Sequence, residues 1–251
     1  MEHYLDNAAT TQTCPEAAEA ALSAMTDCYG NPSSTHTKGR QARKLLDACR
    51  ADVAEALGAS SPEQVVFTSC GSESDNWALL SGAEFMKRAG RHIISSAVEH
   101  DAVRRALEIL EYRGFEVTRL RPDSTGRILP AQVREALRPD TVLVSLMLVN
   151  NETGAVTDIR AVSDTLKSAD SSALLHTDAV QAFKKIPFRA KSLGADLISV
   201  SGHKIHAVKG IGALYIRSGL RLAPMIVGGS QEHRVTESMP PLRISIESFI
   251  F

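Results

Sequence analysis

A lysine placed just after a short apolar run is the residue of this chain best suited to covalent chemistry. Lys204 ends the motif Ser-Gly-His-Lys at residues 201–204, which follows the mostly apolar run at 196–200 and precedes a glycine-rich stretch at 209–212. The apolar run is typical of a buried strand, and lysine is almost never fully buried without a partner. A lysine amine can form a Schiff base with an aldehyde cofactor. We therefore treat Lys204 as a candidate covalent anchor, with an ordinary surface lysine as the alternative.

Polar residues also follow the other strand-like runs of the chain. Residues 68–75 read Thr-Ser-Cys-Gly-Ser-Glu-Ser-Asp and lead into a helical pattern. Small and hydroxyl-bearing residues at a helix start leave backbone N–H groups free for a phosphate, although Ser72 followed by Asp75 is equally compatible with a plain N-cap. Later runs end in three further polar groups, namely Glu99 with His100, Asn150 with Asn151 and Glu152, and His176 with Asp178 and Gln181.

A phosphate cradle, an imidazole, a carboxylate with a nearby amide, and a lysine together meet the needs of pyridoxal 5′-phosphate. The lysine would hold the aldehyde as an imine, and a carboxylate at the pyridine nitrogen would keep it protonated, so that the ring can accept electrons. A histidine stacked on the ring can pack against it and transfer protons. Each residue alone would more often be structural, so the prediction depends on their joint placement at strand ends.

The elements that must position these residues alternate along the chain. Seven strand-like runs are expected at residues 65–68, 92–96, 115–118, 142–146, 173–176, 197–200 and 213–216, and helical patterns at 15–29, 40–58, 75–89, 102–112 and 159–168. Strands alternating with helices predict an α/β fold, here a three-layer αβα sandwich around a mostly parallel seven-stranded sheet. Ligands in such sheets bind outside the carboxyl ends of the strands, where the polar residues lie.

Composition excludes several functional classes. The 251 residues carry 28 basic and 29 acidic side chains, a formal net charge of −1 that gives no support for a nucleic-acid or membrane-surface partner. No apolar run approaches the roughly 20 residues of a transmembrane helix, and the first residues lack a signal sequence. The four cysteines, Cys14, Cys28, Cys49 and Cys70, form no Cys-x-x-Cys pair. We expect a cytoplasmic protein with reduced thiols and no metal site.

On its motifs, the chain resembles a cysteine desulfurase of the iron–sulfur-cluster and nitrogen-fixation type, within the class V aminotransferase family of fold-type I pyridoxal phosphate enzymes. The matching pieces occur in family order from Tyr4 to about Glu232, which is nearly the whole chain. They are residues 4–11, 30–34 with His36, Gly39 and Arg40, 67–69 with 73–76, Glu99 with His100, 149–154, Asp178 with Gln181, and 201–204.

The resemblance implies a role for each matching position. Lys204 would carry the cofactor as an imine and move the proton between substrate and cofactor, and His100 would stack on the pyridine ring and take part in proton transfer. Asp178 would pair with the pyridine nitrogen, and Gln181 would hydrogen-bond the ring oxygen. The remaining cofactor and substrate ligands would be Gly71, Ser72, Ser201 and His203 for the phosphate and Asn151 for the substrate carboxylate.

The resemblance also implies a reaction and its partners. A cysteine desulfurase converts L-cysteine to L-alanine and leaves the sulfur as a persulfide on an enzyme cysteine, from which an acceptor scaffold protein takes it. Such enzymes are homodimers built largely from the domain that this chain matches. The expected activity is therefore that of a pyridoxal phosphate-dependent enzyme transferring sulfur groups.

The chain departs from the family pattern in two places. Cys70 stands in the phosphate loop where the family has glycine, and it would strain the loop if that position requires a positive φ. Because Cys70 lies at the phosphate end, we do not expect it to be the sulfur nucleophile. Residues 228–232 still match the family, but residues 233–240 replace the expected arginine-containing segment, and the tail to Phe251 matches no family motif.

These departures predict three parts and a loss of activity. Residues 1–14 would belong to the small domain, residues 15–232 would form the cofactor-binding large domain, and residues 233–251 would be a divergent tail, with the C-terminal small domain absent. None of the four cysteines occupies the family's catalytic position. The chain therefore looks like a truncated desulfurase, and we expect little or no sulfur-transfer turnover.

Three alternatives remain open. The chain could be another class V enzyme, such as an aminotransferase or a selenocysteine lyase, which needs no cysteine nucleophile in the same place. It could be a non-catalytic remnant that binds a partner, for example a full-length homologue, through the usual dimer face. A generic Rossmann-type nucleotide binder is disfavoured, since no Gly-x-Gly-x-x-Gly turn follows a first strand.

Overall fold

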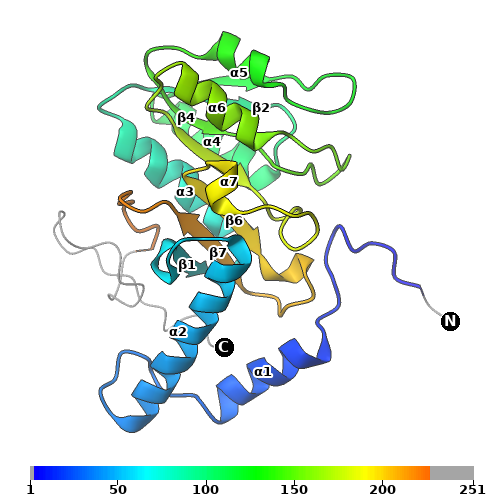
Figure 1. The fold of residues 1–251 in the computed structure, drawn as a ribbon, viewed down its shortest axis with the longest axis vertical. Coiled ribbons are helices and arrows are strands. Elements are labelled where there is room, and N and C mark those ends of the chain that lie inside the picture. Colours follow the sequence, from blue (N-terminus) through cyan, green and yellow to red (C-terminus); the bar gives the residue numbers. More distant parts are fainter. Residues whose placement is uncertain (1–2, 227–251) are drawn as a thin grey trace.

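A seven-stranded sheet lies at the centre of the structure, a computed structural model that describes residues 3–226 (Figure 1). The strand order is β1-β7-β6-β5-β4-β2-β3; β7 runs antiparallel to both β1 and β6, and the other neighbouring strands are parallel. The strands are β1 (Val65–Thr68), β2 (His92–Ser96), β3 (Glu116–Leu120), β4 (Thr141–Ser145), β5 (Leu174–Asp178), β6 (Leu197–Ser201) and β7 (Gly212–Ile216). The predicted mostly parallel sheet is confirmed.

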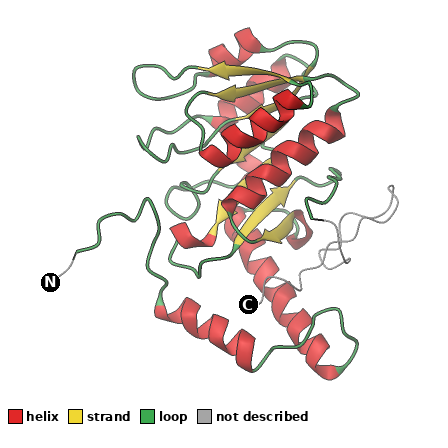
Figure 2. Cartoon of the chain, turned by 180° about the vertical axis from the view of Figure 1, so that it is seen from behind, coloured by secondary structure: helices red, strands yellow, loops and turns green. Residues whose placement is uncertain are grey.

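Helices cover both faces of this sheet, which confirms the three-layer sandwich. One core cluster contains residues of α2, α5, α6 and α7, and the other contains residues of α3 and α4. Figures 1 and 2 show these two layers from opposite sides, with α1 and the start of α2 projecting away from the sheet. The helices are α1 (Pro15–Thr26), α2 (Thr37–Leu57), α3 (Gly71–Met86), α4 (Asp101–Tyr112), α5 (Pro130–Ala136), α6 (Ile159–Ser168) and α7 (Ala190–Leu193), with the short 3-10 helices η1 (Pro62–Gln64) and η2 (Gly202–Lys204).

The predicted elements match the observed ones closely, apart from three helices. α3 begins at Gly71, four residues earlier than expected, and α5 and α7 were not expected at all. α2 ends at Leu57 because Gly58 takes the left-handed conformation at the helix C-cap, as glycine readily does. The family match at residues 228–232 and the predicted tail at 233–251 lie outside the described residues.

Two buried glycines provide a test of how tightly the helix α3 packs on the sheet. A Cβ atom added to Gly212 in β7 would lie 2.7 Å from the carbonyl carbon of Cys70, whereas one added to Gly82 in α3 would meet only side-chain methyls, at 3.5 Å or more. We expect Gly212→Ala to lower the free energy of unfolding by about 1–3 kcal/mol through overpacking. Gly82→Ala should raise it by about 0.5–1 kcal/mol, since alanine favours the helix.

Urea unfolding of the two variants checks this pair. Both substitutions add the same methyl group, so opposite signs separate overpacking beside Cys70 from the helix preference of alanine in α3. Equal effects of the two substitutions would contradict the packing at the start of α3.

Candidate active site

The carboxyl ends of β5 and β6 form the centre of the candidate site. Asp178 is the last residue of β5 and Ser201 is the last residue of β6. Asp178 lies in register with Ser199 in the neighbouring parallel strand, and η2 continues directly from β6 to Lys204. Three predicted site residues, Asp178, Ser201 and Lys204, thus come from adjacent strand ends, as a parallel sheet requires.

The start of α3 provides a place for an anion. The first backbone N–H groups of a helix have no acceptor among the helix's own carbonyls. Here the N-cap residue Cys70 does not supply one either, because its side chain makes no capping hydrogen bond within residues 3–226. A Cβ added to Gly71 would lie 2.7 Å from Cγ2 of Val180 and 3.4 Å from Cβ of Ser201. Gly71 and Ser201 therefore lie close together at one edge of the site, although they are far apart in the sequence.

Two sequence expectations about this loop are corrected. The N-cap of α3 is Cys70, not Ser72, because the helix starts earlier than the pattern indicated. Cys70 has φ −170°, which is extended backbone that any residue can adopt, so the cysteine does not strain the loop. Glu73 fixes the loop instead, since its Oε2 accepts hydrogen bonds from the backbone N and the Oγ of Ser69, both at 2.6 Å.

Asp178 is a buried carboxyl group with several stabilising neighbours. It is 4% exposed, and its Oδ1 accepts a hydrogen bond from the backbone N–H of Val180 at 2.9 Å. Burial raises the pKa of Asp178, and the Val180 hydrogen bond and the positive charges of His100 and Lys204 oppose that rise. Two of the predicted catalytic residues, His100 and Lys204, thus act on Asp178 electrostatically.

Lys204 and Gln181 meet at the same backbone carbonyl. The Nζ of Lys204 donates to the carbonyl oxygens of Ala8 at 2.5 Å and Ala9 at 2.7 Å, and Nε2 of Gln181 donates to that of Ala8 at 2.8 Å. Burial lowers the pKa of Lys204, and the nearby charge of Lys185 lowers it further. A lower pKa leaves more of the amine neutral, which is the form that attacks an aldehyde.

Residues 8–14, here called the N-terminal strap, are tied to the turn that carries Lys204. The hydroxyl of Thr11 donates to the carbonyl of His203 at 2.9 Å and accepts from the backbone N–H of His206 at 2.8 Å. The backbone N–H of Cys14 donates to the carbonyl of His206 at 2.9 Å. The N-terminal strap therefore packs against the turn at residues 203–206.

A positive electrostatic environment surrounds His203. Its Nδ1 lies 3.2 Å from the hydroxyl of Thr10. Burial lowers the pKa of His203, and the positive charges of Lys204, Lys209 and Lys185 lower it further. Several cations close together favour an anionic ligand at this turn.

Three predicted residues make their hydrogen bonds away from the other predicted site residues or have exposed side chains. His100 is exposed, and its Nδ1 accepts from the backbone N–H of Ala102 at the start of α4. Asn151 donates to Glu152 at 2.8 Å, and the side chain of Ser72 is exposed. Within residues 3–226, no hydrogen bond joins these three side chains to the other predicted site residues.

Three titratable residues close to the site had no predicted role. Asp75 in α3 and His176 in β5 are buried, and Glu99 before α4 is half-buried with its Oε2 atom fully covered. Burial raises the pKa of Glu99 to about 8, even though its Oε1 accepts from the Ser96 hydroxyl and the Met147 N–H. Their positions at or near strand and helix ends were visible in the sequence, but burial was the missing signal.

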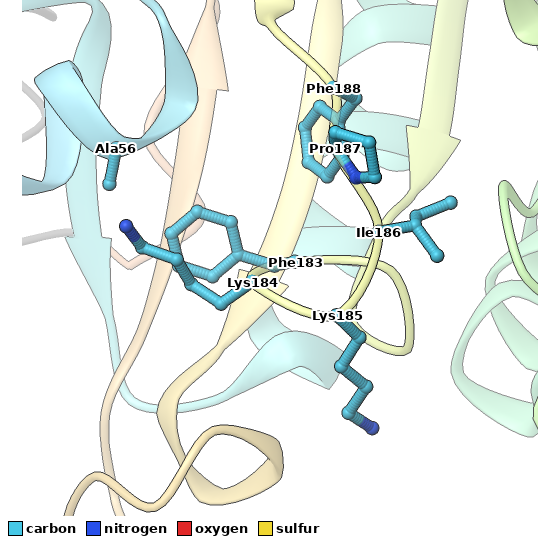
Figure 3. A pocket seen from close by; sticks show the side chains of 7 residues that line it. All are labelled: Ala56, Phe183, Lys184, Lys185, Ile186, Pro187 and Phe188. Carbon is cyan, nitrogen blue, oxygen red and sulfur yellow. The ribbon is translucent and has the colours of Figure 1, made fainter.

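A separate hollow of about 230 Å³ lies between the end of α2 and the segment after β5 (Figure 3). Ala56 and residues 183–188 line it, and Figure 3 shows Lys184 and Lys185 pointing apart. It contains none of the predicted site residues, so it is not the candidate site. In the described part of the chain, no group of three or more His, Cys, Asp or Glu could hold a metal, and no helix is long and apolar enough to cross a membrane.

Comparisons with known proteins place the chain among related sequences. The sequence model of the aminotransferase class-V family matches residues 3–241. The chain is 43% identical over 240 residues to cysteine desulfurase IscS of Methanosarcina thermophila and 46% identical to cysteine desulfurase 2 of Trichormus variabilis. Each alignment covers 94% of this chain but 59% of the relative, so the chain spans about three fifths of these relatives' length.

Solved structures show the same fold. A NifS-like protein superposes with a TM-score of 0.92 at 37% identity, covering 100% of this chain and 66% of that protein. SspA, solved in complex with cysteine, superposes with a TM-score of 0.89 at 36% identity, covering 99% of this chain and 70% of that protein.

The raised pKa of Glu99 predicts a pH-dependent stability. The folded chain holds a proton that the unfolded chain releases above about pH 4.5, so this stabilisation is lost as the pH rises from there to about 8. A difference of one pH unit between the folded and unfolded pKa corresponds to about 1.4 kcal/mol of stability. Glu99→Gln should match the wild type at the acidic end of this range and exceed its melting temperature at the alkaline end. If the melting temperatures of the two proteins changed with pH in the same way across this range, the proposed burial of the Glu99 carboxyl would be wrong.

The strap predicts a second stability effect. Thr11→Val keeps the side-chain shape but removes both hydrogen bonds of the buried hydroxyl, and leaves the His206 N–H without its acceptor. We expect a loss of about 1–3 kcal/mol and faster hydrogen exchange at His206. Thr13→Val is the control, because its hydroxyl makes only a 3.3 Å bond to Ala207 and should cost clearly less. A larger effect at Thr13 would show that the strap is anchored differently.

Proposed function

Because the chain belongs to the class V aminotransferase family, whose members depend on pyridoxal 5′-phosphate, we propose that it binds this cofactor covalently through Lys204. The observation that carries the proposal is the meeting of Lys204, Gln181 and the buried carboxyl of Asp178 at the carboxyl ends of β5 and β6. Lys204 would bond to the aldehyde of the cofactor, Gln181 would hydrogen-bond the ring oxygen, and Asp178 would pair with the pyridine nitrogen.

The residues present fit the phosphate as well as the ring. The Oγ of Ser201 is buried and lacks a hydrogen-bond partner among residues 3–226, which is unusual for a buried hydroxyl. It lies beside Gly71, where an added Cβ would come 3.4 Å from the Cβ of Ser201. Ser72 and His203 flank the same region, so we propose that the four residues hold the phosphate.

Pyridoxal phosphate, when bound, supplies an aldehyde that condenses with amines and a ring that accepts electrons. Ionised Asp178 would hold a proton on the pyridine nitrogen, and Gln181 would orient the ring through its oxygen. Lys204 would carry protons to and from the substrate carbon. We further propose that His100 stacks on the ring and that Asn151 orients the substrate carboxylate.

L-cysteine is the substrate that the comparisons favour. The relatives that this chain resembles at 43% and 46% identity are named cysteine desulfurases, and one structural neighbour was solved in complex with cysteine. We therefore propose that the chain acts on L-cysteine, releasing L-alanine and passing sulfur to a protein cysteine and then to an acceptor scaffold. Since none of the four cysteines occupies the family's nucleophile position, we propose that turnover by this chain alone is slow.

Exposed apolar residues support a homodimer as the partner state. α1 and the turn after it expose Leu22, Met25 and Tyr29, with 57%, 54% and 64% of their surfaces accessible. Apolar residues gathered on one projecting helix are typical of a contact surface. We propose that this helix takes part in the contact between two copies of the chain in the cytoplasm, without nucleic-acid or membrane partners.

Absorbance spectroscopy tests the cofactor proposal. After incubation with pyridoxal phosphate and desalting, we expect the wild type to keep the visible band of a lysine-bound cofactor, and Lys204→Ala to lose it. Lys185→Ala is the matched control, since Lys185 is near enough to lower the pKa of Lys204 but has no proposed bond to the cofactor. A folded wild type without the band, or a Lys204→Ala variant that keeps it, would refute the proposal.

Alanine release from L-cysteine is then measured with the loaded wild type. Slow release is the expected result, and robust release would contradict the proposed impairment. Transamination of a 2-oxo acid by the loaded chain would instead favour the aminotransferase alternative.

A further inference from the structure

A buried carboxyl group with no proposed role lies next to the cofactor site. Asp75 is in the second turn of α3 and is 1% exposed, and its Oδ1 is 3.6 Å from Nε2 of His176. Among residues 3–226, this oxygen has no hydrogen-bond partner. An ionised carboxylate in such a place is costly, because a buried charge needs an opposite charge or a full set of hydrogen bonds.

His176 does not supply that opposite charge. Burial lowers the pKa of His176 to about 3, so its imidazole is neutral near physiological pH. Both ring nitrogens are already engaged by hydroxyl groups, Nδ1 with Ser145 at 2.8 Å and Nε2 with Ser199 at 3.0 Å. Asp75 therefore faces a neutral, hydrogen-bonded ring and not a cation.

Asp178 is also buried, but it has a backbone hydrogen bond and nearby positive charges, whereas Oδ1 of Asp75 has no hydrogen-bond partner among residues 3–226. It is two residues after His176 in β5, so both side chains lie on the same face of the sheet, and α3 packs against β5. Asp178 accepts the Val180 N–H at 2.9 Å, and the positive charges of His100 and Lys204 favour its ionised form. The two buried acids are thus placed in unequal surroundings.

We propose that Asp75 is a positioning residue that keeps the proton of this buried acid pair, so that the single negative charge resides on Asp178. The inference rests on the proposed function, because a charged Asp178 is needed only where a pyridine nitrogen must stay protonated. When two neighbouring acids have unequal surroundings, their pKa values differ, and this difference fixes which of the two is charged.

The charges around Asp75 all act in the same direction. Burial and the negative charge of Asp178 raise the pKa of Asp75 well above its ordinary value, and Glu99 and Cys70 raise it further. The hydroxyl of Ser199 opposes this rise only in part. A proton on Asp75 removes the repulsion that a second carboxylate would otherwise exert on Asp178.

Carbon-13 NMR of the cofactor-free chain, labelled at the aspartate side-chain carboxyls, tests the assignment of the proton. At neutral pH we expect one resonance at the position of a protonated carboxyl, and this resonance should vanish in Asp75→Asn. The resonance that vanishes in Asp178→Asn should be at the position of a carboxylate. A protonated resonance that instead vanishes in Asp178→Asn, or the absence of any protonated resonance at neutral pH, would overturn the inference.

Thermal unfolding of the same cofactor-free proteins provides a second, independent measurement. The folded wild type holds a proton on Asp75 that the unfolded chain releases above the ordinary aspartate pKa, so its stability falls as the pH rises above that value. Asparagine resembles the neutral acid, and Asp75→Asn should reduce this fall. Glu135→Gln on the exposed side of α5 should leave it unchanged.

An unchanged pH dependence in Asp75→Asn would also overturn the inference. Neither measurement requires the cofactor. A failure of cofactor binding would therefore appear only in the Lys204 experiment and would remain distinguishable from a failure at Asp75.

Discussion

The negative charge that we propose for Asp178 is the constraint on which this end of the molecule depends. A carboxylate that is 4% exposed stays ionised only if hydrogen bonds and nearby positive charges replace the lost water. Here the hydrogen bond comes from the segment after β5, the positive charge of Lys204 comes from η2, and His100 at the start of α4 further favours the ionised carboxyl. No single element could supply all three, so the charge depends on the strand order that brings these segments together.

The same constraint explains why the side chains on one face of the sheet change from apolar to polar along β5 and β6. In β5 the residues facing α3 run from Leu174 through His176 to Asp178, and in β6 they run from Leu197 to Ser199 and Ser201. Leu174 and Leu197 belong to the apolar core beneath α3 and α4. Toward the carboxyl edge, hydroxyls and a neutral imidazole replace them, because a buried charge is tolerated only within a hydrogen-bonded polar surrounding.

Much of this could be predicted from the sequence, and the limits have physical causes. The alternation of apolar runs and helical patterns indicated all seven strands, and the residues after them indicated Lys204 and Asp178. The helices α5 and α7 are too short for a clear period of 3.6 residues. The extended backbone of Cys70 and the contact of Ala8 with Lys204, which are 196 residues apart in sequence, are set by tertiary packing. Burial, which decides the protonation of Asp75 and Glu99, is also a property of the folded chain.

Two opposing influences act on the protonation of Lys204, and one of them comes from the N-terminal strap. Carbonyl oxygens of Ala8 and Ala9 favour its charged ammonium form through hydrogen bonds, whereas burial and Lys185 favour the neutral amine. Hydrogen bonds to a charged group contribute about 1.5–3 kcal/mol each, so cofactor attachment must offset their loss. The remaining strap anchors run through Thr11 and Cys14 to the backbone of His203 and His206. Because these anchors do not involve the lysine side chain, Lys204 can leave the two carbonyls while the strap stays in place.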